Sequence, residues 1–310
     1  MIRETRELAP AKLNLGLRVV GRRADGYHLL DSVFVAIDLA DRVGIEVDES
    51  HAGVALEVEG GPPELSDADD NLAARAARAF LDATRLRVAL RLRLEKRIPV
   101  GAGLGGGSSD AGAVLRGLAA RFPGALAAER LAELALGLGA DVPFFLDPRP
   151  ARVTGIGERI EQLAGWPAFP ILVVTPALPL ATREVFEAWD RESLPEGSGA
   201  LTPSGPGRNL ARLPALLSGP HTDGSADSEL TALLANDLEP VATKLRPSIG
   251  RVRAEIERAG ARAVGMSGSG PSVFGVFRSE RGAQTAAERG RWEASDRVHV
   301  GRALATWGVV

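Results

Sequence analysis

Hydrophobic residues recur at every second position along much of the N-terminal third of the chain. This alternation predicts strands, because a strand that buries one face places apolar residues at a period of two. The segments with this character, or with a β-branched apolar run, are Lys12–Val20, Ser32–Leu39, Val43–Val47 and Val54–Val58. We therefore expect an antiparallel or mixed sheet in this part of the chain.

The segment Val88–Glu95 (VALRLRLE) gives the clearest strand pattern. Its apolar residues form one face, and Arg91, Arg93 and Glu95 form the other. One-sided burial is typical of antiparallel pairing rather than of a parallel strand covered on both faces. Before it, apolar spacing predicts a helix over Asn71–Thr84, with Asn71 as the N-cap.

The rest of the chain alternates helices and short strands. Helices are expected over Ser109–Arg121, Ala128–Leu138 (ended by Gly139), Thr182–Trp189, Asn236–Leu245 and Ile249–Ala259, and strands over Ile171–Thr175, Ala263–Met266 and Val273–Phe277. Ser193–Ser228 is dense in Pro, Gly and Ser and is expected to be mostly loop, with a short helix at Leu210–Leu217. Together these elements predict an α+β protein with two domains, residues 1–152 and 153–310.

Composition narrows the classes of function. The chain has 310 residues, 45% of them apolar, and a formal net charge of -3 without a basic stripe, so nucleic acid is not an expected partner. It contains no cysteine, which excludes disulfides and thiolate metal sites. The sequence has no apolar run of the roughly 20 residues that a membrane span needs. Its charged start has no apolar segment typical of a signal peptide, so we expect a cytoplasmic protein.

The glycine-rich segment PVGAGLGGGSS is the strongest candidate for chemistry. Glycines let backbone N–H groups approach a phosphate, and the N-terminus of a following helix adds partial positive charge. A flexible surface turn is the alternative. The string contains the dinucleotide pattern at Gly101, Gly103 and Gly106, but the preceding strand is amphipathic and Lys96–Pro99 separates it from the glycines. The GxxxxGK[ST] loop is excluded because no lysine follows the glycines.

What remains resembles the ATP loop of the GHMP kinases, the superfamily of galactokinase, homoserine kinase and mevalonate kinase. Three blocks carry the resemblance: APAKLNLGL, PVGAGLGGGSS and GMSGSGPSVFG. It implies a ribosomal-protein-S5-like N-terminal domain, a ferredoxin-like α/β sandwich at the C-terminus, and ATP with Mg²⁺ as cofactors, although no residue cluster indicates the metal ligands. The implied ATP-binding residues are Pro99, Val100, Gly101, Ala102, Gly103, Leu104, Gly105, Gly106, Gly107, Ser108 and Ser109.

Within this superfamily the flanking segments are similar to the 4-diphosphocytidyl-2-C-methyl-D-erythritol kinase family of the non-mevalonate isoprenoid pathway. These segments are Lys12–Leu15, Arg23–His28, Gly139–Phe145 and Asn236–Pro240. The resemblance implies phosphorylation of the 2-hydroxyl of that small molecule. Gly112 departs from it, standing where alanine is usual. The alternatives are another GHMP kinase (for mevalonate, homoserine or a sugar), a dinucleotide-dependent oxidoreductase, or a nucleotide-binding module without catalysis.

The same resemblance implies two catalytic residues. Asp141 is the expected general base, and Lys12 lies beside it and stabilises charge on the phosphoryl group. By themselves, Asp141 fits the N-cap of a short helix and Lys12 fits a surface lysine. A second glycine-rich turn, Gly265–Ser272, either closes over the phosphates or packs under the first loop.

The substrate side is expected to include five further residues. The resemblance places Asn14 near the reacting hydroxyl, Tyr27 and His28 at the cytosine base, and Thr182 and Phe186 on the far wall. An aromatic plane for stacking and a ring nitrogen for hydrogen bonding suit a pyrimidine. Without the resemblance, Tyr27 and His28 form an ordinary turn leading into a strand.

Overall fold

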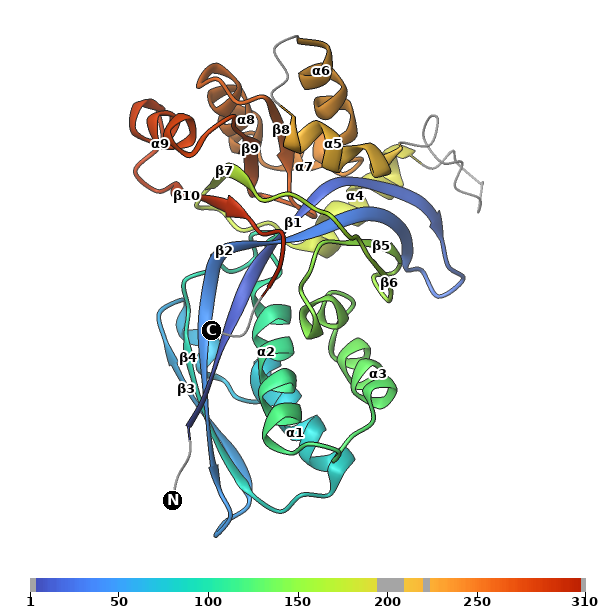
Figure 1. The fold of residues 1–310 in the computed structure, drawn as a ribbon, viewed down its shortest axis with the longest axis vertical. Helices are drawn as coiled ribbons and strands as arrows, with labels where there is room; N and C mark the ends of the chain where they lie inside the picture. The colour runs from blue at the N-terminus through green and yellow to red at the C-terminus, as the bar shows by residue number, and fades with distance from the viewer. Residues whose placement is uncertain (1–3, 194–208, 220–223, 308–310) are drawn as a thin grey trace.

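Two long antiparallel strands run through both halves of the molecule (Figure 1). The computed structural model describes residues 4–193, 209–219 and 224–307. Strand β1 (Glu4–Arg22) pairs with β2 (His28–Asp48). The expectation of two separate strands, 32–39 and 43–47, is wrong. The polar residues Asp41 and Arg42 interrupt the apolar pattern, but both keep their place opposite β1, and Asp41 is buried with partners.

In the N-terminal half, helices cover one face of the sheet (Figure 1). Strand β4 (Ala89–Glu95) pairs antiparallel with β2, as its alternation predicted, and parallel with β3 (Gly53–Glu59). Apolar residues of these strands pack against α1 (Leu72–Thr84), α2 (Gly106–Arg121) and α3 (Ala128–Leu138). Short 3-10 helices η1 (Pro63–Ser66) and η2 (Val142–Leu146) complete this half, and β5 (Ala151–Gly155) joins β2 and β6 (Arg159–Gln162).

The C-terminal half is an antiparallel sheet in the order β10-β7-β9-β8. Its strands are β7 (Phe169–Thr175), β8 (Ala263–Met266), β9 (Val273–Val276) and β10 (Arg297–Ala303). Its helices are α4 (Thr182–Ser193), η3 (Leu210–Arg212), α5 (Leu213–Ser218), α6 (Gly224–Leu233), α7 (Glu239–Leu245), α8 (Ser248–Arg258) and α9 (Glu280–Arg289). One pairing, Ala303 opposite Ile37, connects this sheet to β2.

The α+β class is confirmed, and several element boundaries differ from expectation. Helix α2 begins at Gly106 rather than Ser109. Residues 224–228, expected to be loop, start helix α6, which buries Ala226 and Leu230. Helix α7 starts at Glu239 because the side chain of Asn236 accepts a hydrogen bond from Leu238 N and holds a turn.

Other expectations have different outcomes. The Asn71 cap is confirmed, since its side chain accepts from Ala73 N, and so is Gly139 as the end of α3. The pattern did not reveal α9 or β10. The loop expected at 194–208 and 220–223 lies outside the described residues. The division at residue 152 stays a prediction. No described helix has the length and apolar character needed to cross a membrane.

Candidate active site

The glycine loop follows β4 and leads into the N-terminus of α2. Gly105 adopts the left-handed conformation (φ 72°) as N-cap of the helix, and no side chain caps the first turn. The backbone N–H groups at a helix start have no partner within the helix, so an uncapped start is suited to bind an anion. Pro99–Ser108 line a cavity of about 450 Å³. Ser109, the last residue expected to bind ATP, is instead fully buried in α2 and does not line the cavity.

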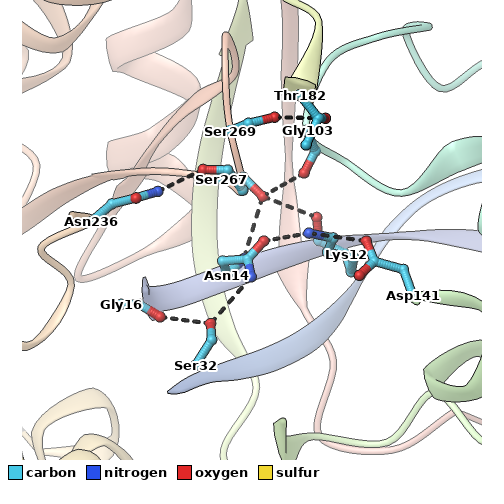
Figure 2. Close-up of polar contacts among 11 residues, drawn as sticks. Lys12, Asn14, Gly16, Ser32, Gly103, Asp141, Thr182, Asn236, Ser267 and Ser269 are labelled. Carbon is cyan, nitrogen blue, oxygen red and sulfur yellow. Dashed lines mark hydrogen bonds and ion pairs between the residues drawn. The ribbon is translucent and has the colours of Figure 1, made fainter. Parts of the chain in front are cut away.

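The second glycine-rich turn packs directly against the first loop. Ser267 Oγ donates to the carbonyl of Gly103 at 2.9 Å, and Ser272 N donates to the carbonyl of Ala102 at 3.3 Å. Figure 2 shows Ser267 between β1 and the loop. Of the two arrangements expected for this turn, packing under the loop is therefore present. Gly268 and Ser269 also line the cavity, whereas contact with the nucleotide stays a prediction.

Lys12 and Asp141 meet at the wall of the same cavity (Figure 2). Lys12 Nζ lies 3.6 Å from Asp141 Oδ2, and the Lys12 side chain is only 4% exposed, so the surface-lysine interpretation is wrong. Asp141 occupies the N-cap position of η2 but makes no capping hydrogen bond. Its carboxylate faces the lysine instead.

Burial and charge act in opposite directions on Lys12. Burial lowers the pKa of Lys12, and the neighbouring Asp141 carboxylate opposes this but does not cancel it. The ammonium also lies 4.7 Å from the ring centre of Phe34 and donates to Asn14 Oδ1. A cation held this way is directed at the cavity and is poorly hydrated, which strengthens its interaction with an incoming anion.

Asn14 is fixed by a buried hydrogen-bond network (Figure 2). Its Nδ2 donates to Ser32 Oγ at 3.1 Å, and Ser32 Oγ donates to the carbonyl of Gly16 at 2.6 Å. Its backbone N donates to Ser267 Oγ at 3.3 Å. Because Nδ2 is committed to Ser32, Oδ1 is turned toward Lys12. The network therefore orients both side chains.

The structure brings only part of the expected substrate side into the cavity. Asn14, Phe186 and Thr182 line it, and the Thr182 hydroxyl lies 2.9 Å from that of Ser269. Tyr27 is 60% exposed and does not line the cavity. His28 stacks on Phe186 at 4.6 Å between ring centres, outside the cavity.

Sequence reasoning missed two residues that support the site. Asp190 Oδ1 lies 2.7 Å from His28 Nε2 and holds the ring beside Phe186. Asn236 Nδ2 donates to the carbonyls of Met266 and Gly268 and so fixes the second turn. Asp190 offered no signal in the sequence, whereas Asn236 lies in a segment that already carried the family resemblance. A larger hollow of about 890 Å³ lies along β1, β2, β3 and β4, away from both glycine turns.

Comparison with known proteins identifies the class. The family model for the GHMP kinases N terminal domain matches residues 71–147, and that for the GHMP kinases C terminal domain matches residues 215–291. The chain is thus a GHMP kinase, an ATP-dependent small-molecule kinase.

Relatives that align over most of their length identify the family. A 4-diphosphocytidyl-2-C-methyl-D-erythritol kinase from Syntrophotalea carbinolica is 40% identical over 93% of this chain and 96% of its own length. One of the same name from Anaeromyxobacter dehalogenans is 42% identical over 90% of this chain and 83% of its own. This chain belongs to the 4-diphosphocytidyl-2-C-methyl-D-erythritol kinase family.

Solved structures agree with this assignment. The crystal structure of a 4-(cytidine 5'-diphospho)-2C-methyl-D-erythritol kinase has a TM-score of 0.77 and 38% identity, covering 98% of this chain and 100% of that one. A homoserine kinase from Cytophaga hutchinsonii has a TM-score of 0.65 at 19% identity, covering 96% of this chain and 94% of its own, which shows the shared fold alone.

Proposed function

We propose that this protein transfers the γ-phosphoryl group of ATP to the 2-hydroxyl of 4-diphosphocytidyl-2-C-methyl-D-erythritol. The observation that carries the proposal is the pair of the buried Lys12 and the half-buried Asp141 in the cavity that also contains the uncapped N-terminus of α2. A base, a cation and an anion-binding helix start are the groups that phosphoryl transfer needs, because the reaction depends on positioning and charge stabilisation.

The chemistry divides between these residues. The first-turn amides of α2 and the loop Pro99–Gly105 bind the phosphates of ATP. Asp141 accepts the proton of the acceptor hydroxyl while the hydroxyl oxygen forms a bond to the γ-phosphorus of ATP. The bond between that phosphorus and the β-phosphate oxygen breaks, which releases ADP. Lys12 stabilises the negative charge on the transferring group, and Asn14 holds Lys12 in place.

Mg²⁺ is expected with the nucleotide, since this ion usually binds through substrate phosphates and one or two carboxylates. Residues 4–193, 209–219 and 224–307 contain no group of three His, Cys, Asp or Glu side chains that could hold an ion by themselves. The arrangement thus fits an ion carried mainly by the phosphates, where it would neutralise charge. We assign it no protein ligands.

On the acceptor side, Phe186 and Thr182 form part of the cavity wall. The exposed Tyr27, which directly precedes His28, supplies an aromatic plane. We propose that the cytosine base binds on this side. His28 supports the wall in the present arrangement, because its ring stacks on Phe186 and its Nε2 is paired with Asp190. A cytoplasmic location and the absence of a nucleic-acid partner stay predictions.

An ADP-release assay over a panel of acceptors tests this function. The panel contains 4-diphosphocytidyl-2-C-methyl-D-erythritol, mevalonate, homoserine and galactose, and Asp141→Asn serves as the control. We expect ATP-dependent turnover with the cytidine compound alone, lost in the variant. Turnover with another acceptor at equal or higher kcat/KM would overturn the assignment. Reduction of NAD by the wild type, with one of these alcohols as the hydride donor, would indicate an oxidoreductase.

A further inference from the structure

A buried cluster of one lysine and two aspartates lies directly behind the glycine loop. It has no role in the phosphoryl transfer proposed for Lys12 and Asp141. Lys96 Nζ lies 2.6 Å from Asp110 Oδ2 and also donates to Asp41 Oδ2. The three side chains, which come from the end of β4, α2 and β2, are at most 4% exposed. Burying three ionisable groups costs hydration free energy, which their mutual attraction offsets only where the geometry is close and further hydrogen bonds are made.

The bridge connects the two ends of the loop. At the start of the loop, Asp41 Oδ1 accepts hydrogen bonds from Arg97 N at 2.5 Å and Ile98 N at 2.8 Å. At the end, Asp110 lies in α2, about one turn after the helix begins at Gly106. The ammonium itself lies under that first turn, since a Cβ built on Gly106 would be 3.5 Å from Lys96 Nζ.

We propose that Lys96, with Asp41 and Asp110, is a positioning bridge for the nucleotide loop. It holds the entry and the exit of the loop at a fixed separation, so that the first-turn amides of α2 stay directed at the phosphates. Both Lys96 and Asp110 line the same cavity as the loop. The proposal rests on the proposed function only as far as a nucleotide binds at this loop.

The charge of the bridge depends on Asp110. Burial raises the pKa of Asp110 to about 8, the ammonium of Lys96 opposes the shift, and the carboxylate of Asp41 adds to it. These two residues are the charged groups that face it. Burial by itself would lower the pKa of Lys96, but the two carboxylates outweigh it and the net shift is upward. With Asp110 protonated the bridge is neutral, and with Asp110 ionised it carries one negative charge.

A nucleotide polyphosphate at the start of α2 favours the neutral bridge, because an added negative charge beside the phosphates is repulsive. Binding of ADP near pH 8 is therefore coupled to uptake of a proton by Asp110. A purely structural ion pair would show no such coupling, because its protonation would be the same with and without nucleotide.

Titration calorimetry with ADP on the full chain, in two buffers of different ionisation enthalpy, measures this proton uptake. We expect uptake at pH 8 in the wild type and its loss in Asp110→Asn. The matched control is Asp296→Asn, which makes the same change at a buried carboxylate paired with Arg251 in the other half of the molecule. Equal uptake in Asp110→Asn and wild type would overturn the proposal.

A second variant tests positioning. Lys96→Met should weaken ADP binding by about tenfold or more, since small misplacements of binding groups have effects of this size. Asp110→Asn added to Lys96→Met should recover part of the loss, because it removes the charge of one of the two carboxylates that lose their ammonium partner. Wild-type ADP affinity in Lys96→Met would also overturn the proposal. ADP binding does not involve the acceptor, so failure of the cytidine compound as a substrate leaves this test intact.

Discussion

Lys12 Nζ and Asp141 Oδ2 lie 3.6 Å apart, although one residue is on β1 and the other precedes η2. Both residues line the cavity, but the Lys12 side chain is only 4% exposed, whereas that of Asp141 is 33% exposed. An acceptor hydroxyl can thus approach the carboxylate while the ammonium stays shielded from water.

Asp141→Asn should lower kcat by about two to four orders of magnitude, since it removes the general base while keeping the shape of the side chain. Lys12→Met should produce a comparable loss through the missing positive charge. Steady-state kinetics and ADP titration check this, with ADP affinity close to wild type in both variants. Normal turnover in either variant would show that the pair does not take part in transfer.

The pH dependence of kcat should reveal Lys12. Its pKa lies below the ordinary 10.5, because burial outweighs the carboxylate, so the ammonium and the activity are lost as the pH rises through that lowered value. At pH values between this lowered pKa and 10.5, Lys12 binds a proton in the unfolded chain but not in the folded one. The contribution of Lys12 to the free energy of unfolding therefore rises with pH in this window. A pH–rate profile measures the alkaline limb.

The control is Lys12→Arg, whose guanidinium stays charged to higher pH, so any remaining activity should lack this limb. An alkaline limb at or above pH 10.5 in the wild type would contradict the assignment of the limb to Lys12.

Gly103→Ala should disrupt the contact between the two glycine turns. Its φ is +73°, and a Cβ there would lie 2.2 Å from the carbonyl oxygen of Ser267, so backbone must move. Gly124→Ala is the matched control, with φ +79° and nothing within 4 Å of the added Cβ. The control should cost only the left-handed strain of about 1–2 kcal/mol.

Thermal unfolding and the KM for ATP measure both glycine variants. We expect Gly103→Ala to lose more stability than Gly124→Ala, and only Gly103→Ala to have a raised KM for ATP. Equal effects of the two substitutions would mean that strain at positive φ, and not the contact with Ser267, accounts for the loss.

Tyr27→Ala should raise the KM for the acceptor and leave stability within about 0.5 kcal/mol of wild type, because the side chain is exposed. His28→Leu, by contrast, should lower stability, since it removes the ring that stacks on Phe186 and takes one of the two partners of Asp190, leaving only Arg22 at 3.5 Å. Acceptor kinetics and denaturant unfolding separate the two effects. An unchanged acceptor KM in Tyr27→Ala would remove Tyr27 from the base site.

Local patterns predicted most of the regular structure. The alternation in Val88–Glu95 gave β4, and the apolar spacing after Asn71 gave α1 with its cap. The same reasoning failed where tertiary contacts compensate for a locally unfavourable pattern. Strand β2 continues through Asp41 because its carboxylate accepts hydrogen bonds from Lys96 and from two backbone amides, all of them distant in sequence.

The sequence by itself indicated a phosphate-binding loop and argued against the two commoner kinds, since the density of glycine, the amphipathic lead-in strand and the missing lysine are all local properties. It also carried the family resemblance that named Lys12 and Asp141. Only the tertiary structure decided that Lys12 is buried, that His28 lies behind Phe186, and that Lys96 joins both ends of the loop. Burial and ion pairing depend on which distant segments pack together, and no local periodicity encodes that information.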